Sequence, residues 1–254
     1  MTDAPEVTRV RHETKRRELV VARVESLAPS MVRVVLGGAQ LAGFTSLGFD
    51  DHVKLFFPAS GEAAPEMRDF TPRRYDAGAG ELSIDFFLHE AGPAANWAMQ
   101  VSPGQLLSVG GPRGSLIIPV EGIDSHVLIG DETALPAIGR RLEELPSSAS
   151  AFVVMETGVG AQDYPLASRA RLEVRKIVRA AEAVAGAKRI VEALRTVPFS
   201  PGSWFTWVAG ESQVAREIRR NLTAERGIDK RRVKAAGYWR LGSVGAHERI
   251  SDED

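Results

Sequence analysis

Arginines, an aromatic ring and a hydroxyl are closely spaced in the stretch Arg68–Tyr75. If this stretch is one strand, one face carries Arg68, Phe70 and Arg74, and the other carries Thr71, Arg73 and Tyr75. A guanidinium pairs with phosphate, a ring packs on a flat ring system, and a hydroxyl hydrogen-bonds its edge. These groups together suit a flavin nucleotide. A solvated edge strand with a single core Phe explains the same residues equally well.

A helix start with free backbone amides is predicted shortly after His89. Gly92 followed by Pro93 is typical of a first helical turn, which leaves the N–H of Ala94 and of the next residue without intrahelical partners. Such an N-terminus attracts a pyrophosphate group. An ordinary loop-to-helix turn, with Trp97 in the hydrophobic core and His89 as a structural residue, explains the same pattern.

Three turns place polar or aromatic residues where strands of an α/β sheet would end. Asp131 and Thr133 follow a short apolar run, and Thr133 is the expected N-cap of a helix that begins at Ala134. The segment 210–212 occupies the same kind of turn one βα unit later, and 238–240 follows the last apolar run. Ligands bind at the carboxyl ends of parallel strands. A plain helix cap and a hydrophobic plug at the sheet edge are the alternatives.

Several familiar motifs are absent from the chain. The glycine-rich segment 110–115 lacks the Gly-Lys-Ser/Thr ending of a phosphate-binding loop, and 158–160 lacks the third glycine of a dinucleotide fingerprint. The five histidines do not have zinc-ligand spacing, and there is no Gly-x-Ser-x-Gly nucleophile elbow. We therefore predict no resident metal and assign no catalytic side chain.

Composition narrows the function classes further. The 254 residues include 32 Lys and Arg and 33 Asp and Glu, so bulk electrostatic binding of nucleic acid is not expected. Cysteine is absent, which excludes disulfides, cysteine-ligated iron–sulfur clusters and thiolate nucleophiles. Any redox chemistry therefore needs an organic cofactor or a substrate metal. Because neither a signal segment nor a membrane-spanning run is present, we expect a cytoplasmic protein.

The first half of the chain has the pattern of a β domain. Short β-branched or aromatic runs are separated by Gly, Pro and Asp, which favours a closed antiparallel barrel over a helical domain. The predicted strands are Leu19–Val24, Met31–Leu36, Val53–Phe57, Arg68–Tyr75, Leu82–Leu88 and Leu106–Val109.

The second half alternates strands and helices, which predicts a mostly parallel sheet covered by helices. The predicted strands are 127–129, 152–155, 172–178, 205–209 and 233–236, and the helices include 134–145, a window around 191–194 and 213–226. The two patterns change near Pro119–Asp124. We therefore predict a β-barrel domain at 1–120 and a parallel α/β domain at 121–254. By analogy with flavin reductases of the same layout, the first would be a flavin-binding domain and the second NAD(P)H-binding-like. This layout is that of ferredoxin reductase-like flavin enzymes.

Together these segments resemble the siderophore-interacting protein family, the flavin-dependent ferric-siderophore reductases. The resemblance extends from about Leu19 to Arg240. The segments that carry it are Asp51–Leu55, Arg68–Asp76, Asp85–Trp97, Gly111–Ser115, Asp131–Ala137, Trp207–Glu211 and Gly237–Arg240. Several such segments in the family's order are far more specific than any one alone.

The resemblance implies a bound FAD and a set of residues around it. The family's flavin motif Arg-x-Tyr-Thr-x-Arg maps onto Arg68, Phe70, Thr71 and Arg73. Phe70 departs from the family's Tyr, so ring packing on the flavin survives while a hydrogen bond from a phenol is lost. The other cofactor-binding residues implied are His89, Gly92, Pro93, Ala94, Trp97, Asp131, Thr133, Ala134, Tyr238 and Trp239.

The reaction implied is a ferric-siderophore reduction. NAD(P)H gives a hydride to FAD, which passes single electrons to Fe(III) in a bound siderophore. Fe(II) is held more weakly, so the iron is released. A nearly neutral chain needs local charge to bind an anionic ferric siderophore, and the resemblance places Lys54, Arg113 and Arg240 around the flavin's exposed side. Three unrelated surface cations are the alternative.

Other functions are compatible with the same sequence. One is a flavin reductase fed by ferredoxin or acting on another acceptor. Another is a siderophore-binding protein without reductase activity. The choice between NADH and NADPH also stays open, because five cations could either meet a 2′-phosphate or form a solvated basic face: Arg175, Lys176, Arg179, Lys188 and Arg189.

Overall fold

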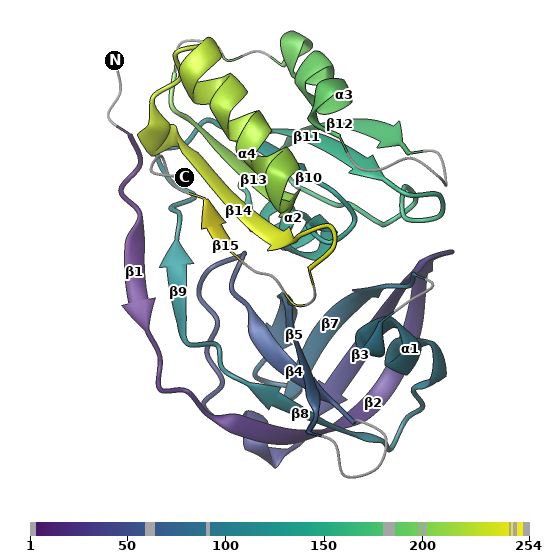
Figure 1. The fold of residues 1–254 in the computed structure, drawn as a ribbon. Coiled ribbons are helices and arrows are strands. Elements are labelled where there is room, and N and C mark those ends of the chain that lie inside the picture. The colour runs from purple at the N-terminus through teal and green to yellow at the C-terminus, as the bar shows by residue number, and fades with distance from the viewer. Residues whose placement is uncertain are drawn as a thin grey trace. The chain divides into compact units, whose positions relative to one another are not determined.

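The computed structural model describes residues 4–58, 64–89, 92–179, 186–197, 199, 202–243, 245 and 248–250 (Figure 1). The chain divides into two compact units. The barrel unit comprises Val7–Ile117 and Asp163–Pro165. The α/β unit comprises Met1–Glu6, Ile118–Gln162 and Leu166–Asp254.

The barrel unit is built on a seven-stranded antiparallel sheet in the order β5-β4-β8-β2-β3-β7-β6. Its strands are β2 (Arg16–Ala28), β3 (Met31–Gly37), β4 (Val53–Phe57), β5 (Glu66–Phe70), β6 (Pro72–Asp76), β7 (Glu81–Phe87) and β8 (Leu106–Gly110). Alternate side chains point into one core, as Val53, Leu55 and Phe57 do on β4. The predicted all-β first half is therefore confirmed.

The sheet curls because its two edge strands follow one another in sequence. β5 ends at Phe70 and β6 begins at Pro72, so only Thr71 separates two strands at opposite edges of the sheet. The prediction of one continuous strand over Arg68–Tyr75 is wrong. Proline has no N–H to continue a ladder and restricts the residue before it. The sheet is thus a curled half-barrel with its edges joined at Thr71, and the hydrogen-bond ladder of a closed barrel is not seen among the described residues.

Two short strands of the barrel unit were not predicted from the sequence. β1 (Thr8–Arg11) pairs antiparallel with β9 (Gly114–Ile117) in a separate two-stranded sheet. The polar composition of β1 and the glycine at the start of β9 hide the alternation that marks a strand.

The α/β unit has a six-stranded sheet in the order β12-β11-β10-β13-β14-β15. Its strands are β10 (Ser125–Gly130), β11 (Ser150–Thr157), β12 (Arg171–Val178), β13 (Trp204–Glu211), β14 (Val233–Trp239) and β15 (Glu248–Ile250). All pairs are parallel except β14–β15. Because the strand order reverses between β10 and β13, their carboxyl ends form the topological switch point of a doubly wound sheet.

Helices α2 (Leu135–Glu144), α3 (Ala187–Ala193) and α4 (Ser212–Arg220) belong to the α/β unit (Figure 1). The prediction that Thr133 caps α2 is wrong: the N-cap position is Ala134, and the Thr133 side chain donates to Asp131 instead. Helix α4 is shorter than predicted, since Asn221–Glu225 forms a wider π-type turn. The N-cap residue of α4 is Glu211, whose carboxylate accepts from the backbone N–H groups of Gln213 and Val214.

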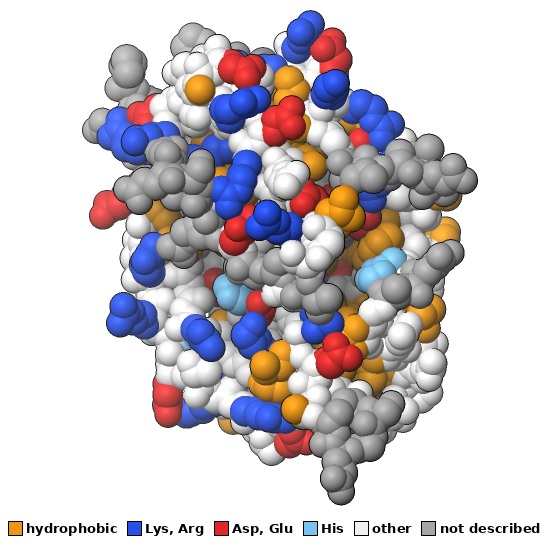
Figure 2. Space-filling view, viewed as in Figure 1, with side chains coloured by type: hydrophobic (Ala, Val, Ile, Leu, Met, Phe, Trp, Pro, Cys, Tyr) orange, Lys and Arg blue, Asp and Glu red, His pale blue; other side chains and the backbone are white. Residues whose placement is uncertain are grey.

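The surface carries both signs of charge. Lys and Arg side chains are interspersed with Asp and Glu on the face shown in Figure 2, as the nearly equal numbers of basic and acidic residues lead one to expect. No helix within the described residues is long and apolar enough to cross a membrane.

We predict that His126, on β10, makes the protein acid-sensitive. Its side chain is 1% exposed, and burial, followed by the nearby Arg141, lowers its pKa to about 3. The unfolded chain protonates this imidazole near pH 6.5, so stability present above that pH is lost as pH falls toward 3. This residue alone should lower the free energy of unfolding by about 2 kcal/mol between pH 6.5 and 5.

Urea unfolding at both pH values, for wild type and His126→Leu, measures that contribution. The free energy of unfolding should fall less on acidification in the variant than in the wild type. Equal losses in the two proteins would contradict the prediction.

Candidate functional site

An aromatic cluster in the barrel unit contains Phe57, Phe70, Phe86 and Trp97. The ring centroids of Phe70 and Phe86 are 4.6 Å apart, and that of Trp97 is 5.6 Å from both Phe57 and Phe86. Phe57 and Phe86 are buried, whereas Phe70 and Trp97 are only partly buried. The cluster therefore brings together two predicted cofactor residues that are distant in sequence. The buried rings of Phe57 and Phe86 also give Phe70 and Trp97 a rigid apolar support.

Arg68 lies on the edge strand β5, and its guanidinium makes weak interactions with neighbouring residues. Its guanidinium donates to Glu66 Oε2 at 2.9 Å and to the Met67 carbonyl at 2.8 Å. The Glu66 side chain is 51% exposed, and an ion pair of this kind contributes little. Arg68 can therefore exchange its partner for a phosphate. Thr71 is buried at the junction of the two edge strands.

Arg73 belongs to a buried network. The Tyr164 hydroxyl donates to Asp85 Oδ2 at 2.5 Å and accepts from Arg73 Nε at 3.2 Å. Arg33 donates to both oxygens of Asp85, at 2.7 and 2.9 Å. Burial raises the pKa of Tyr164, which keeps the hydroxyl protonated as a donor. Arg73 is thus tied to barrel residues, and its predicted contact with a cofactor stays a prediction.

The turn before α1 (Pro93–Gln100) has the features expected of an anion site. Gly92 at the N-cap position has φ +119°, which favours glycine, and Pro93 occupies the first turn. No side chain among the described residues caps this helix, so its first N–H groups, including that of Ala94, are available. His89 lies beside Gly92, and burial lowers its pKa.

Two of the three predicted substrate-binding cations lie in the barrel unit. Lys54 on β4 donates to both oxygens of Asp69 at 2.9 and 3.0 Å, and its side chain is 38% exposed. Lys54 pairs with Gly110 across β4 and β8, and Arg113 is an exposed residue just beyond that strand. The third cation, Arg240, is an exposed residue of the α/β unit.

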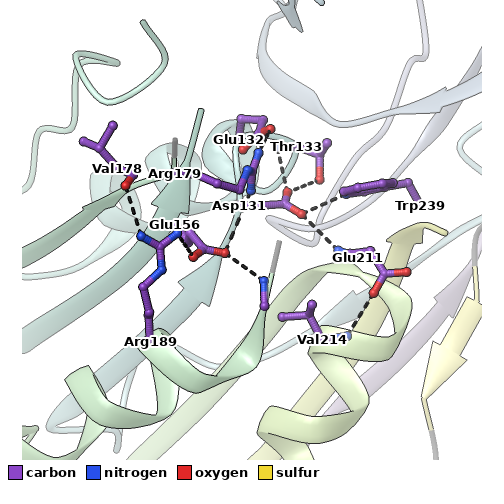
Figure 3. Close-up of polar contacts among 11 residues, drawn as sticks. Asp131, Glu132, Thr133, Glu156, Val178, Arg179, Arg189, Glu211, Val214 and Trp239 are labelled. Carbon is purple, nitrogen blue, oxygen red and sulfur yellow. Dashed lines mark hydrogen bonds and ion pairs between the residues drawn. The ribbon is translucent and has the colours of Figure 1, made fainter. Parts of the chain in front are cut away.

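Asp131 accepts four hydrogen bonds at the end of β10 (Figure 3). Thr133 donates from its backbone N at 2.9 Å and from Oγ1 at 2.5 Å, and the Glu211 backbone N donates at 2.9 Å. The fourth donor is Trp239 Nε1 at 2.8 Å. Burial raises the pKa of Asp131, and the hydrogen bonds partly offset that effect. Gly210 is required beside it, because a Cβ there would lie 2.5 Å from Asp131 Oδ2.

The remaining predicted cofactor residues of the α/β unit are Ala134, Tyr238 and Trp239. Ala134 is fully buried at the start of α2. Tyr238 and Trp239 are the last two residues of β14. The prediction that they follow this strand is therefore wrong. Tyr238 makes an edge contact with buried Trp207, with ring centroids 6.0 Å apart, while Trp239 is held by Asp131.

An ion cluster extends from Asp131 toward β12 and α3. Arg179 donates to Glu132 Oε1 at 2.5 Å and lies 3.9 Å from Glu156 Oε2. Arg189 Nη2 lies 2.6 Å from Glu156 Oε1. Burial and the neighbouring Asp131 raise the pKa of Glu132, while Arg179 opposes the shift. Figure 3 shows these four side chains side by side at the carboxyl edge of the sheet.

A narrow crevice lies at the switch point. Its lining includes Gly130, Asp131, Glu156, Gly210 and Glu211, together with apolar residues of α3 and α4. This is where a doubly wound sheet binds a nucleotide. Sequence reasoning missed Glu156, although a carboxylate directly after the apolar run 152–155 was a usable signal. It also missed Tyr164, which local pattern could not connect to Asp85.

Family models match both halves of the chain. The model described as siderophore-interacting FAD-binding domain matches residues 20–67 and 59–116, and the model described as siderophore-interacting protein matches residues 123–242. The chain belongs to the siderophore-interacting protein family. The predicted family is therefore confirmed.

Full-length relatives support this membership. The chain is 41% identical to an NADPH-dependent ferric-chelate reductase of Escherichia coli, over 91% of this chain and 95% of the relative. It is 30% identical to a ferric vibriobactin reductase of Vibrio cholerae, over 89% and 90% of the two chains. The crystal structure of a siderophore utilization protein from T. fusca superposes with a TM-score of 0.86 at 37% identity, covering 95% and 98%.

The fold prediction is confirmed as well. A ferredoxin reductase from carbazole 1,9a-dioxygenase, at 18% identity, superposes with a TM-score of 0.62 over 87% of this chain and 68% of that one. At that identity the likeness shows the fold alone, and it is the predicted ferredoxin reductase-like combination of barrel and α/β sheet.

The barrel residues of this siderophore-interacting protein fit FAD, the cofactor named in its family model. Partly buried Phe70 and Trp97 offer an apolar surface for a flat ring. The uncapped start of α1 offers backbone N–H groups to a pyrophosphate. Arg68 adds a guanidinium whose present partners are weak.

We predict that Tyr164→Phe destabilises the protein by about 1.5–3 kcal/mol, because it removes a hydrogen bond to the buried, charged Asp85. Tyr75→Phe is the matched control. Its hydroxyl donates to the neutral Leu41 carbonyl at 3.0 Å, so a smaller loss of about 0.5–1.5 kcal/mol is expected. Urea unfolding measures both. A Tyr164→Phe loss no larger than the control's would contradict the role of this network.

Proposed function

We propose that this protein is an FAD-dependent reductase that passes electrons from NAD(P)H to ferric siderophores, releasing Fe(II) for iron acquisition. The observation that carries the proposal is the set of FAD-compatible groups in the barrel unit: the Phe70–Trp97 aromatic cluster, Arg68 and the uncapped start of α1. The switch-point crevice of the α/β unit supports a nucleotide donor. Relatives named as ferric-chelate and ferric vibriobactin reductases support the acceptor.

Each half of the chain has its own task in this proposal. The 1–120 domain holds FAD, and the 121–254 domain receives the nicotinamide nucleotide. Cofactor contacts are proposed for Arg68, Phe70, Thr71, Arg73, His89, Gly92, Pro93, Ala94 and Trp97, and for Asp131, Thr133, Ala134, Tyr238 and Trp239. Arg68 and the α1 amides bind phosphate oxygens, and the rings of Phe70 and Trp97 exclude water from the flavin.

FAD, when bound, supplies the conversion of a two-electron hydride donor into single electrons for iron. The protein's part is to bind, orient and shield. Phe70, standing where the family motif has Tyr, provides packing without a phenol donor. We assign no side chain as an acid or base on the metal, since reduction itself weakens the bonds between iron and the siderophore oxygens.

The proposed location is the cytoplasm, where NAD(P)H is available. Ferredoxin is the alternative donor. A siderophore-binding protein without reductase activity is the alternative function, and the two functions give different results in one experiment.

Anaerobic reduction of the purified protein tests the proposal. The protein should purify yellow, release FAD on denaturation, and lose its flavin absorbance on addition of NADH or NADPH. Ferric siderophore should then restore the absorbance while a chelator traps Fe(II). A colourless protein that still has no flavin after incubation with FAD would overturn the proposal, even if it binds ferric siderophore.

We predict that Arg68→Ala weakens FAD binding about tenfold to a hundredfold, the effect of losing a charged phosphate contact worth roughly 1.5–3 kcal/mol. Arg74→Ala is the control, because Arg74 is an exposed arginine on β6, the strand at the opposite edge of the sheet, and is paired with Asp76. Titration of the apoproteins with FAD measures both affinities. An unchanged affinity in Arg68→Ala would mean that Arg68 is only a surface charge.

We also predict that neutralising Lys54, Arg113 and Arg240 together raises KM for an anionic ferric siderophore more than for a neutral or cationic one. Local positive charge attracts the anionic complex. FAD content and flavin reduction by the donor should barely change. A control variant neutralises three exposed cations elsewhere: Lys15, Arg195 and Arg231.

Steady-state kinetics with siderophores of different charge makes this comparison. Equal losses for all acceptors would indicate damage to the flavin site. No loss for any acceptor would mean that these three cations do not contribute to siderophore binding.

A further inference from the structure

A single carboxylate occupies the position that selects between nicotinamide donors in doubly wound sheets. Glu156 is the second-last residue of β11, the strand beside β10, and its side chain lines the switch-point crevice. In such sheets an acidic residue about 20 positions after the first βα turn binds the adenosine ribose hydroxyls of NAD, whereas an arginine accommodates the 2′-phosphate of NADP. Glu156 follows Gly130, the last residue of β10, by 26 positions.

The Glu156 carboxylate is fixed in place. Its side chain is 2% exposed, Oε2 accepts from the Gly186 backbone N at 3.1 Å, and Oε1 lies 2.6 Å from Arg189 Nη2. Arg189 is itself held by the Val178 carbonyl at 3.3 Å. A carboxylate has about four acceptor sites, so Glu156 retains capacity for further donors such as ribose hydroxyls.

The arginines near Glu156 offer no surplus positive charge. Arg179 is paired with Glu132 at 2.5 Å, and Arg189 with Glu156. Asp131 and Glu211 add two more carboxylates to the lining of the same crevice. A 2′-phosphate would therefore meet net negative charge, whereas a ribose diol is neutral and donates to carboxylates. Arg179 and Arg189 thus form internal ion pairs with Glu132 and Glu156.

Two buried polar atoms of the cluster lack a hydrogen-bond partner among the described residues. They are Glu132 Oε2 and Arg179 Nη1. Both side chains are about nine-tenths buried or more. Orphaned buried atoms of this kind are costly unless a ligand or water satisfies them.

We propose that Glu156 makes this protein prefer NADH over NADPH as its donor, although a 41% identical relative is named for NADPH. The inference rests on the proposed reductase function and concerns which donor that function uses. Glu156 accepts the ribose hydroxyls of NADH and, with its neighbouring carboxylates, repels the extra phosphate of NADPH.

Kinetics and binding together test this inference. Wild-type kcat/KM for flavin reduction should be about tenfold or more higher with NADH than with NADPH. Calorimetry should show tighter binding of ADP-ribose than of 2′-phospho-ADP-ribose. Glu156→Gln removes the charge and releases Arg189, so it should move both ratios at least tenfold toward the phosphorylated nucleotide.

Two further variants provide a control and an independent test. Glu173→Gln is the matched control, because Glu173 is an arginine-paired carboxylate of the same sheet outside the crevice lining, and it should leave both ratios unchanged. Arg189→Leu removes a half-exposed cation and should weaken NADPH further while sparing NADH. If Glu156→Gln does not fold, the inference is tested by the NADH-to-NADPH ratios of the wild type and Arg189→Leu.

A wild-type preference for NADPH would overturn the inference, as would unchanged ratios in folded Glu156→Gln. Binding of neither nucleotide would also overturn it, even if ferredoxin supports iron reduction. Preferential binding of ADP-ribose without iron reduction would instead leave the inference standing while the proposed function fails.

Discussion

The Asp131 carboxylate ties together the carboxyl ends of three parallel strands. It follows β10, accepts from the Glu211 backbone at the end of β13, and accepts from the Trp239 indole at the end of β14. The β13–β14 pairing extends to Glu211 and Trp239, whereas the pairing of β10 with β13 ends at Gly130. Two further hydrogen bonds, both from Thr133, help to satisfy this buried carboxylate, which would be costly to leave unpaired. The crevice, the start of α4 and the position of Trp239 all depend on this interaction.

The barrel unit depends on a comparable constraint at the junction of its two edge strands. Thr71 alone connects the two edge strands, so Phe70 on one side and Arg73 on the other are held close along the chain although their strands are at opposite edges of the sheet. Phe70 is supported by the aromatic cluster, and Arg73 by Tyr164 and Asp85. Residues proposed to touch the cofactor are therefore positioned by the same contacts that stabilise the core.

Sequence patterns predicted the parts of this structure that depend on local chemistry. Alternating apolar runs predicted β2, β3 and β4, and strand–helix alternation predicted the parallel sheet. The patterns gave wrong predictions where two local interactions compete. Thr133 looks like a helix cap, but its hydroxyl bonds to Asp131. Arg68–Tyr75 looks like one strand, but Pro72 begins a second one.

The ion cluster shows a second limit, which concerns partners that are distant in sequence. Arg179 and Arg189 are basic residues whose sequence context suits a solvated face or a phosphate site. Only the fold shows that Glu132 and Glu156, from other strand ends, already neutralise them. Tyr164 is a further case, since 79 residues separate it from Asp85, its hydrogen-bond acceptor. Side-chain partners separated by this much sequence cannot be inferred from spacing.

The central claim is that electrons reach siderophore iron through the flavin bound to this chain. A single-turnover experiment tests it directly: the FAD-loaded protein is reduced anaerobically, freed of excess donor, and mixed with ferric siderophore and a ferrous chelator. The account predicts flavin reoxidation at the same rate as chelator-trapped Fe(II) appears, with roughly two Fe(II) formed per flavin. Formation of Fe(II) without flavin reoxidation, or reduced flavin that persists beside bound ferric siderophore, would contradict it.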